Sequence, residues 1–517
     1  MMQKIFDNVE HVIIYVIQYI GLIVFGIFTL ASMLITLYVP DMGASAFSWR
    51  WDIWPVYLIV ILAALIGLRR LSVWVAGKKR GETILLLLVL GYIALMSLIL
   101  LVFGNAAPNG DSYSVYDLGF GFSQNSYYTA FAWPGSYLNF YPQQLGLAVY
   151  YEWIFRLCES ISFPVSVYHV IKLFNVGLVL ITVFCQWLFV RRLENRGLAS
   201  IYYLLIVPFC LPLIFYSSFT YGEVPSLAFI SLSCLGIQKL VEKKKWYYVL
   251  MIGVAVALSV LLRKNSLIFV IAAVIILLLS FFREQKCIYL VTTVVVMGAA
   301  LLAPHALKSH YETKAGASLS AGVSAWSYFA MGMQDSESGA GVYNGYNFDV
   351  YAQCQGDAEL IEEVSKAALK ERATYLFKHP LEMGSFYARK LLGQWMDGEF
   401  ECRKYTAVNY GNRIQFFHEI YDGKLANAFT EICSVYQFFI YAGVLCSMAY
   451  VTVKKAFLQV KPYYYIGLLT VLGGVAFHLL WEAASRYGFV YLILMLPYAA
   501  WGLSRVKKAD AKYPKIT

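Results

Sequence analysis

An acidic, aromatic segment directly after a long apolar run carries the residues best suited to chemistry. The apolar run covers 83–103, and the segment begins at Asn109 with carboxylates at Asp111 and Asp117. A carboxylate held beside hydrocarbon is costly, so its presence at a membrane surface favours a functional role. Carboxylates also serve as general bases that remove a proton from a hydroxyl. We expect Asp111 to be such a base and Asp117 to be a loop residue or a minor helper.

Sugar transfer from a lipid phosphate to a hydroxyl is one reaction that such a base would serve. It needs a carboxylate for the acceptor proton, cations for the departing phosphate and an apolar groove for the lipid tail. Further candidates lie at the ends of later apolar runs: Glu223, Arg263, Lys264, Glu482, Arg486 and Tyr487. Glu482 and Arg486 share a helix face, so they either serve the substrate or neutralise each other. No P-loop, nucleophile elbow or zinc-protease motif is convincingly placed, so NTP hydrolysis and proteolysis lack support.

The composition indicates that membrane helices hold these residues. Of 517 residues, 60% are hydrophobic and only 14% are charged, a balance that fits a transmembrane bundle rather than a soluble domain. Apolar runs of roughly 18–25 residues recur along the chain, each long enough to cross the hydrocarbon core. The net charge of +10 comes from short basic clusters between these runs, which is the positive-inside pattern. No basic stripe marks a soluble domain, so a nucleic-acid partner is not expected.

The basic clusters orient the chain. They are Lys78-Lys79-Arg80, Arg191-Arg192 with Arg196, Lys243-Lys244-Lys245, Arg283 with Lys286, Lys454-Lys455, and Arg505 with Lys507-Lys508. With all of them in the cytoplasm, we expect about 12 crossings. These cover 12–38, 53–76, 83–103, 165–190, 199–216, 225–241, 247–262, 267–282, 288–306, 432–453, 463–481 and 487–504. The predicted fold is an all-α integral membrane bundle with both termini in the cytoplasm.

Two long segments are expected outside the membrane. The first covers 104–163 and includes 141–158, which we interpret as an amphipathic helix at the outer interface, with a short re-entrant helix as the alternative. The second covers 307–431, where we expect a soluble helix at 357–377 and an amphipathic helix at 381–396. Loops of this length usually carry function or are disordered, and the aromatic content here favours order.

These limits divide the chain into three parts. We expect a transmembrane module at 1–306 that contains the catalytic first outer loop, an extracytoplasmic region at 307–431, and final transmembrane helices with a short tail at 432–517. Cys354 and Cys402 lie in the same outer region and could pair, although unpaired thiols are the favoured interpretation.

Several motifs occur in an order that resembles a known class of enzymes. They are Asp111 in the first outer loop, the aromatic–proline pattern Tyr137 to Gly146, Tyr221 to Ser226, Arg263 to Ser266, His379-Pro380 with Lys390 and Trp395, and Glu482 to Tyr487. In this order they resemble the GT-C class of polytopic glycosyltransferases, which includes protein O-mannosyltransferases and bacterial aminoarabinose transferases. The closing acid and Ser-Arg-Tyr pattern is similar to Gram-positive members that act on cell-envelope polymers.

The resemblance implies inverting transfer from a polyprenyl-phosphate sugar at the outer membrane face. By analogy, Asp111 is the catalytic base. The candidates to hold the donor phosphate are Arg263, Lys264 and Arg486. Tyr141 and Gln143 would line the acceptor side, and Glu223, Glu482, Tyr487, Asp117, Lys390 and Trp395 are further site candidates.

Departures from the class narrow the expected acceptor and cofactor. Protein O-mannosyltransferases have two adjacent acidic residues, whereas Asp111 is followed by Ser112, which argues against a protein acceptor. A cell-envelope glycan, teichoic acid or glycolipid is the expected acceptor. No cofactor is expected, because most users of lipid-phosphate sugars in this class need no metal. A divalent cation held by Asp111 with Asp117 or Glu223 is the less favoured alternative.

Two other functions fit parts of the sequence. A flippase or transporter for a lipid-linked sugar needs charges near the middle of its spans. The predicted span centres are nearly uncharged here, and Lys172, near the outer part of its span, is the main exception. A glycan polymerase or ligase that uses a lipid-pyrophosphate donor would need similar cations. The sequence alone separates it poorly from a glycosyltransferase that uses a lipid-monophosphate sugar.

Overall fold

The computed structural model describes residues 2–38, 48–193 and 197–506 of the chain. Within these residues, nine helices are long and apolar enough to cross a membrane. They begin at Asn8, Trp54, Gly81, Val167, Glu223, Lys264, Cys287, Ala426 and Pro462. Two shorter apolar helices, Ala199–Phe209 and Trp246–Leu262, and the buried helix α23 (Ser485–Leu503) accompany them. The predicted all-α membrane fold is therefore confirmed.

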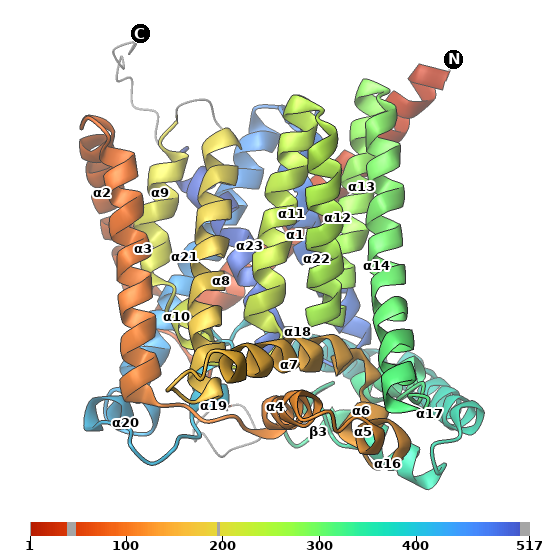
Figure 1. The fold of residues 1–517 in the computed structure, drawn as a ribbon. Coiled ribbons are helices and arrows are strands. Elements are labelled where there is room, and N and C mark those ends of the chain that lie inside the picture. The colour runs from red at the N-terminus through yellow and green to blue at the C-terminus, as the bar shows by residue number, and fades with distance from the viewer. Residues whose placement is uncertain (1, 39–47, 194–196, 507–517) are drawn as a thin grey trace.

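The helices form an upright bundle with a layer of helices across one end (Figure 1). The helices α7 (Leu145–Ser160) and α18 (Pro380–Trp395) lie across the lower ends of the upright helices in this view, and α4 (Gly110–Ser123) lies below α7. The helix α1 (Met2–Leu34) begins at the opposite end. The two outer segments expected from the sequence thus meet in one layer.

The layer contains the three helices that the sequence predicted for the outer segments. The segment 141–158 forms α7, the segment 357–377 forms α17 (Ala358–Lys378), and the segment 381–396 forms α18. The remaining short helices of the layer are α5 (Tyr128–Ala132), α6 (Tyr137–Phe140), α15 (Ala325–Gly332), α16 (Tyr346–Gln353), α19 (Cys402–Thr406) and α20 (Gln415–Tyr421).

Three predicted spans break or end differently in the structure. The expected span 199–216 is broken into α9 (Ala199–Ile206), a 3-10 turn at Val207–Phe209 and α10 (Leu211–Tyr216), because prolines at 208 and 212 cannot continue a regular helix. The expected span 12–38 ends early, since Ile35–Tyr38 forms strand β1 and pairs with β2 (Ser48–Trp51).

The third difference is α14 (Cys287–Ala315), which continues nine residues beyond the predicted end at 306, through Pro304, and joins the outer layer. The other upright helices are α2 (Trp54–Ala76), α3 (Gly81–Ile99), α8 (Val167–Leu193), α11 (Glu223–Lys243), α12 (Trp246–Leu262), α13 (Leu267–Glu284), α21 (Ala426–Val453) and α22 (Ile466–Leu480). Arg196, Lys507 and Lys508, which belong to the predicted basic clusters, lie outside the described residues.

Two glycines let the outer layer approach the bundle closely. A Cβ atom on Gly146, at the start of α7, would overlap the carbonyl of Leu261 at the end of α12. A Cβ atom on Gly222, just before α11, would overlap the neighbouring carbonyl of Leu262. Both contacts bring the outer layer and the start of α11 against the segment that carries Arg263.

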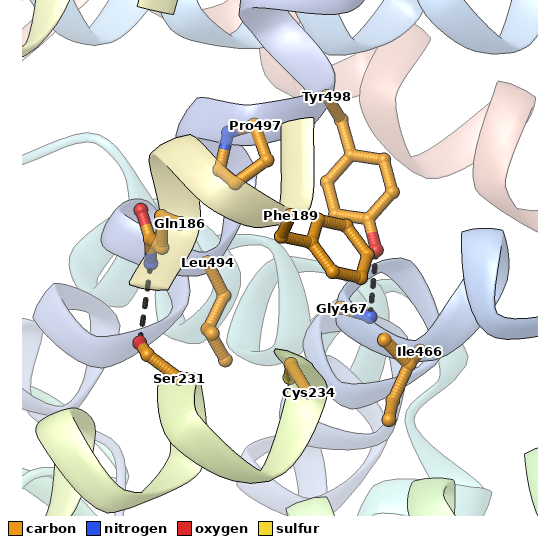
Figure 2. Close-up of a pocket in the computed structure, with 9 residues that line it drawn as sticks. All are labelled: Gln186, Phe189, Ser231, Cys234, Ile466, Gly467, Leu494, Pro497 and Tyr498. Carbon is orange, nitrogen blue, oxygen red and sulfur yellow. Dashed lines mark hydrogen bonds between the residues drawn. The ribbon is translucent and has the colours of Figure 1, made fainter. Parts of the chain in front are cut away.

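A small cavity lies inside the bundle between α8, α11, α22 and α23 (Figure 2). Gln186 donates a hydrogen bond to Ser231 across it at 3.5 Å, and the Tyr498 hydroxyl accepts one from the Gly467 N–H at 2.9 Å. Its volume of about 20 Å³ holds roughly one water molecule. The cavity is therefore too small for a sugar.

Candidate active site

The predicted base lies beside one of the predicted phosphate ligands. Asp111 occupies the first turn of α4, and Arg486 occupies the first turn of α23. The Nη2 atom of Arg486 lies 3.6 Å from Oδ2 of Asp111. The Asp111 side chain is 42% exposed and that of Arg486 is 11% exposed. The carboxylate is thus held near a buried guanidinium while its other face stays accessible.

Local hydrogen bonds fix the start of α4. The Ser112 hydroxyl accepts a hydrogen bond from the Asn109 N–H at 3.0 Å and donates one to the Asn109 carbonyl at 2.8 Å. This reciprocal arrangement is half of a capping box, in which a side chain at the third helical position satisfies the residue before the helix. The first turn, which includes Asp111, therefore begins at a defined residue.

The second predicted arginine is buried in the same region. Nη1 of Arg263 lies 2.6 Å from Oε1 of Glu223, and their side chains are 10% and 1% exposed. The Arg263 guanidinium lies 5.9 Å from the ring centre of Tyr221 and 5.6 Å from that of Tyr487. The guanidinium of Arg486 lies 5.8 Å and 5.1 Å from the same two rings. Two shared tyrosines therefore bring the two arginines into one cluster.

Glu482 adds a buried carboxylate to this cluster. It accepts a hydrogen bond from the Tyr487 hydroxyl at 3.0 Å. Burial raises the pKa of the Glu482 carboxyl, while the charge of Arg486 opposes that rise. The negative charge of Glu482 lies close enough to Lys390 to favour the charged form of the lysine. The Lys390 ammonium donates a hydrogen bond to the Gly332 carbonyl. Burial nevertheless lowers the pKa of Lys390 to about 7.

Tyrosines surround the accessible side of Asp111. Burial raises the pKa of Tyr137, Tyr141 and Tyr343, and the nearby charge of Asp111 raises it further in each case. The rings of Tyr137 and Tyr141 lie 5.0 Å apart. Tyr343 is exposed and lies beside Tyr141, while Gln143 lies beside Tyr328. Phenol rings and hydroxyls of this kind suit the faces and edges of a sugar.

A small cavity lies beside Arg263 on the bundle side. Its lining includes Arg263, Asn265 and Tyr487 together with Ser226, Thr470 and Tyr491. The lining residues come from α11, α13, α22 and α23, and from Arg263 and the 3-10 turn Lys264–Ser266 that joins α12 to α13. Polar side chains therefore lie in the space between these helices.

Among the described residues, no group of three or more His, Cys, Asp or Glu side chains comes together in a way that could hold a metal ion. Glu223, which was considered as a partner of Asp111 in such a site, is instead paired with Arg263. Cys354 and Cys402 are both buried, unpaired thiols.

The sequence of the central part of the chain matches a known family. Residues 148–307 match the family described as dolichyl-phosphate-mannose-protein mannosyltransferase. The match supports a GT-C-like glycosyltransferase. The helical bundle and its membrane-length helices are consistent with a polytopic glycosyltransferase of this type. The comparison with curated proteins finds no match.

The matched segment of the glycosyltransferase contains only part of the cluster. Glu223 and Arg263 fall within it, whereas Asp111 and Arg486 lie outside it. The grouping of these four residues comes from their positions in the fold, since they reach the cluster from α4, α11, the end of α12 and α23.

Two predicted site residues, Asp117 and Trp395, lie apart from this cluster, and Lys264 lies at its edge. Asp117 is exposed and lies six residues beyond Asp111 on α4, about 240° around the helix. Trp395 is fully buried, with its ring 5.0 Å from that of Phe28, so it packs in the core. Lys264 is exposed beside Arg263 and forms no ion pair with another described residue.

One part of the candidate site was missed from the sequence. Oε2 of Glu401 accepts a hydrogen bond from the Arg486 N–H at 3.1 Å, and Oδ2 of Asp397 accepts one from the Ser485 hydroxyl at 2.7 Å. Burial, reinforced by Glu399, raises the pKa of Asp397 to about 7. Three acidic residues at alternate positions in an otherwise apolar chain were the signal available. Asp397 and Glu401 hold the first turn of α23 and so the backbone of Arg486, whereas Glu399 pairs with Arg403.

Proposed function

We propose that this glycosyltransferase moves a sugar from a polyprenyl-phosphate donor to a hydroxyl of a cell-envelope glycan, teichoic acid or glycolipid, with inversion at the anomeric carbon. The observation that carries the proposal is the 3.6 Å pairing of Asp111 with Arg486 beside the buried Arg263. A base and two phosphate-binding cations are the groups that a single displacement at a phosphate-linked sugar requires.

Asp111 acts as the general base. Its carboxylate takes the proton of the acceptor hydroxyl as the hydroxyl oxygen forms a bond to the anomeric carbon. The bond between that carbon and the phosphate oxygen breaks, and the polyprenyl phosphate leaves with the electron pair. The exposed face of Asp111 supports this role, because an acceptor must reach the carboxylate.

Arg486 and Arg263 bind the donor phosphate and stabilise the charge that builds up as it leaves. Guanidinium groups suit phosphate because they donate two parallel hydrogen bonds. The distance of 3.6 Å between Arg486 and Asp111 is long for an ion pair. This supports the proposal that the Arg486 guanidinium can turn from Asp111 toward a phosphate. Lys264, exposed beside Arg263, supplies a further cation for the incoming donor.

The acceptor binds on the tyrosine-lined side. Tyr141 and Tyr343 lie near Asp111, and Gln143 is held by Tyr328 at the same edge. These groups combine flat apolar faces with hydroxyl and amide hydrogen bonds, which supports a carbohydrate or polyol hydroxyl as the acceptor.

The reaction takes place at the outer membrane face. The basic cluster at Lys78-Lys79-Arg80 joins α2 to α3 at the bundle end opposite the outer layer (Figure 1). Basic clusters of this kind remain in the cytoplasm. This arrangement supports an extracytoplasmic layer, cytoplasmic termini and a donor that reaches the site from the outer leaflet.

The donor class is tested by offering purified protein a polyprenyl-monophosphate sugar and the matching polyprenyl-diphosphate sugar. Each is supplied in lipid nanodiscs with cell-envelope extract as acceptor. We expect sugar transfer and release of polyprenyl phosphate from the monophosphate only. Turnover of the diphosphate alone would replace the proposal with a lipid-pyrophosphate ligase or polymerase, and movement of intact lipid-linked sugar without transfer would indicate a flippase.

A further inference from the structure

The segment that carries Asp111 into the site is not held by its own helix alone. The chain leaves α3 through a π-helical turn at Leu100–Gly104, and Asn105 follows with a left-handed φ of 44°. The next residues then run beside a distant part of the chain. Ala106 forms a β-bridge with Asn409, and the Ala107 N–H donates to the Val408 carbonyl at 2.8 Å.

Lys172 contacts this segment from the outer end of α8. Its side chain is fully buried, and Nζ donates a hydrogen bond to the Ala106 carbonyl at 2.5 Å. Nζ also lies 4.3 Å from the ring centre of Tyr168. A buried ammonium group needs such partners, because an unpaired one is costly. A carbonyl five residues before Asp111 is therefore bound to one of the rigid upright helices.

The same part of α8 also contacts α4 itself. The ring of Tyr168 packs edge-on against that of Tyr116 on α4 at 5.7 Å, and against that of Tyr410 at 5.8 Å. Tyr168 thus lies between the helix that carries Asp111 and the segment paired with Ala106. Lys172 and Tyr168 are one helical turn apart and act on the same unit.

A second cation secures the preceding turn. Arg413 donates from Nε to the Gly104 carbonyl at 2.9 Å and from Nη2 to the Thr406 carbonyl at 2.8 Å. Its guanidinium stacks over the Tyr421 ring at 3.7 Å. Arg413 therefore joins the end of the third span to the later segment, on the other side of Asn105 from Lys172.

We propose that Lys172 is a positioning residue for Asp111. It fixes the Ala106 carbonyl to α8, and through the short segment 106–109 it fixes the first turn of α4. It contacts neither substrate nor reacting atoms. The proposal rests on the proposed function, in which Asp111 takes the acceptor proton. A shift of about 1 Å at such a base lowers the rate by about a hundredfold.

The first test measures the loop directly and needs no substrate. Amide hydrogen exchange is followed by mass spectrometry in nanodiscs for the wild type and Lys172→Met, which keeps the length and removes the ammonium. We expect faster exchange in peptides that cover 104–110, and unchanged exchange in α8 beyond that contact. Lys308→Met, which removes a partly exposed lysine from α14, should leave both regions unchanged. Unchanged exchange at 104–110 in Lys172→Met would overturn the proposal.

The second test separates positioning from general destabilisation. In the sugar-transfer assay, Lys172→Met should lower kcat at least tenfold and leave the donor KM within twofold of the wild type. In the Asp111→Asn background the same change should cause no further loss, because its effect acts through Asp111. An equal loss of rate in both backgrounds, or a wild-type kcat in the single variant, would overturn it.

A second variant keeps the proposal testable if Lys172→Met does not fold. Lys172→Gln keeps a polar side chain but is too short to make the same contact with the Ala106 carbonyl, and we expect the same pattern on a smaller scale. A failure of the proposed function is distinguishable from a failure of this inference. If the proposed function is wrong, the wild type does not transfer sugar from any polyprenyl-phosphate donor. If only the positioning role is wrong, the wild type is active and the variants match it in hydrogen exchange and in kcat.

Discussion

The buried ion pair between Arg263 and Glu223 allows stability and catalysis to be separated. Glu223 is 1% exposed, so Arg263→Met leaves a carboxylate buried without its counter-charge. Removal of one partner of a buried pair costs about 3–5 kcal/mol of stability. Replacement of both partners by methionine removes both charges, and such changes are often neutral. We expect the double variant to lie within about 1 kcal/mol of the wild type.

Chemical denaturation in mixed micelles measures the stability of each variant, and sugar transfer is measured on the same preparations. Arg263→Met should be both destabilised and inactive. The double variant should recover its stability and stay inactive, because the cation that we propose to bind the donor phosphate is still missing. Lys308→Met, whose partly exposed pair with Glu312 is 3.8 Å long, serves as control and should cost about 0–1 kcal/mol.

Two results would refute this reasoning. A stability of Arg263→Met equal to that of the wild type would show that the pair does not hold the fold. Wild-type transfer by the stable double variant would show that Arg263 does not bind the donor phosphate.

Two further predictions concern the residues around the cluster. Lys390 has a folded pKa of about 7 because of its burial, below its unfolded value of about 10.4. Between about pH 7 and pH 10.4 the unfolded state therefore binds more protons than the folded state. The free energy of unfolding should rise with pH across this window by at most about 1.4 kcal/mol per pH unit. Denaturation of Lys390→Met at several pH values should show that this slope is lost. Tyr141→Phe should raise the KM for the acceptor severalfold and leave the donor KM unchanged in steady-state assays, and a change confined to the donor KM would argue against an acceptor role for Tyr141.

The helical fold and much of the cluster could be predicted because they depend on simple patterns. Amphipathic spacing predicted α7 and α18, a polar segment predicted the soluble helix α17, and the basic clusters predicted which helix ends would share a side. That common side brought Asp111, Glu223, Arg263 and Arg486 together although they are far apart in sequence. The assignments of Asp117 and Trp395 to the site rested on proximity to a motif alone, and the structure directs one to solvent and the other into the core.

The acidic segment from Asp397 to Glu401 could not be predicted in this way. Phe400 and Glu401 adopt left-handed φ values of 50° and 56°, which non-glycine residues adopt only when tertiary contacts hold them. Those contacts include the Tyr216 hydroxyl, which donates to the Phe400 carbonyl at 2.6 Å. The residues that make these contacts are far apart in sequence, so no local sequence pattern predicts the backbone conformation of Phe400 and Glu401.

The bridge between Ala106 and Asn409 was missed for the same reason. It joins two segments about 300 residues apart in irregular loops, where neither hydrophobic periodicity nor a turn motif marks the pairing. The hydrogen bond from Lys172 was hidden as well, because a lysine in an apolar run first suggests a charged path through the membrane.

The most direct measurement of the central claim compares two isosteric variants on one helix. Asp111→Asn removes the carboxylate 3.6 Å from Arg486, and Asp117→Asn makes the same change on the exposed side of α4. With polyprenyl-phosphate sugar as donor, the first should lower kcat by about 10²–10⁴, as expected for the loss of a general base, and the second should stay within twofold of the wild type. A folded Asp111→Asn variant with near-normal kcat would contradict the account.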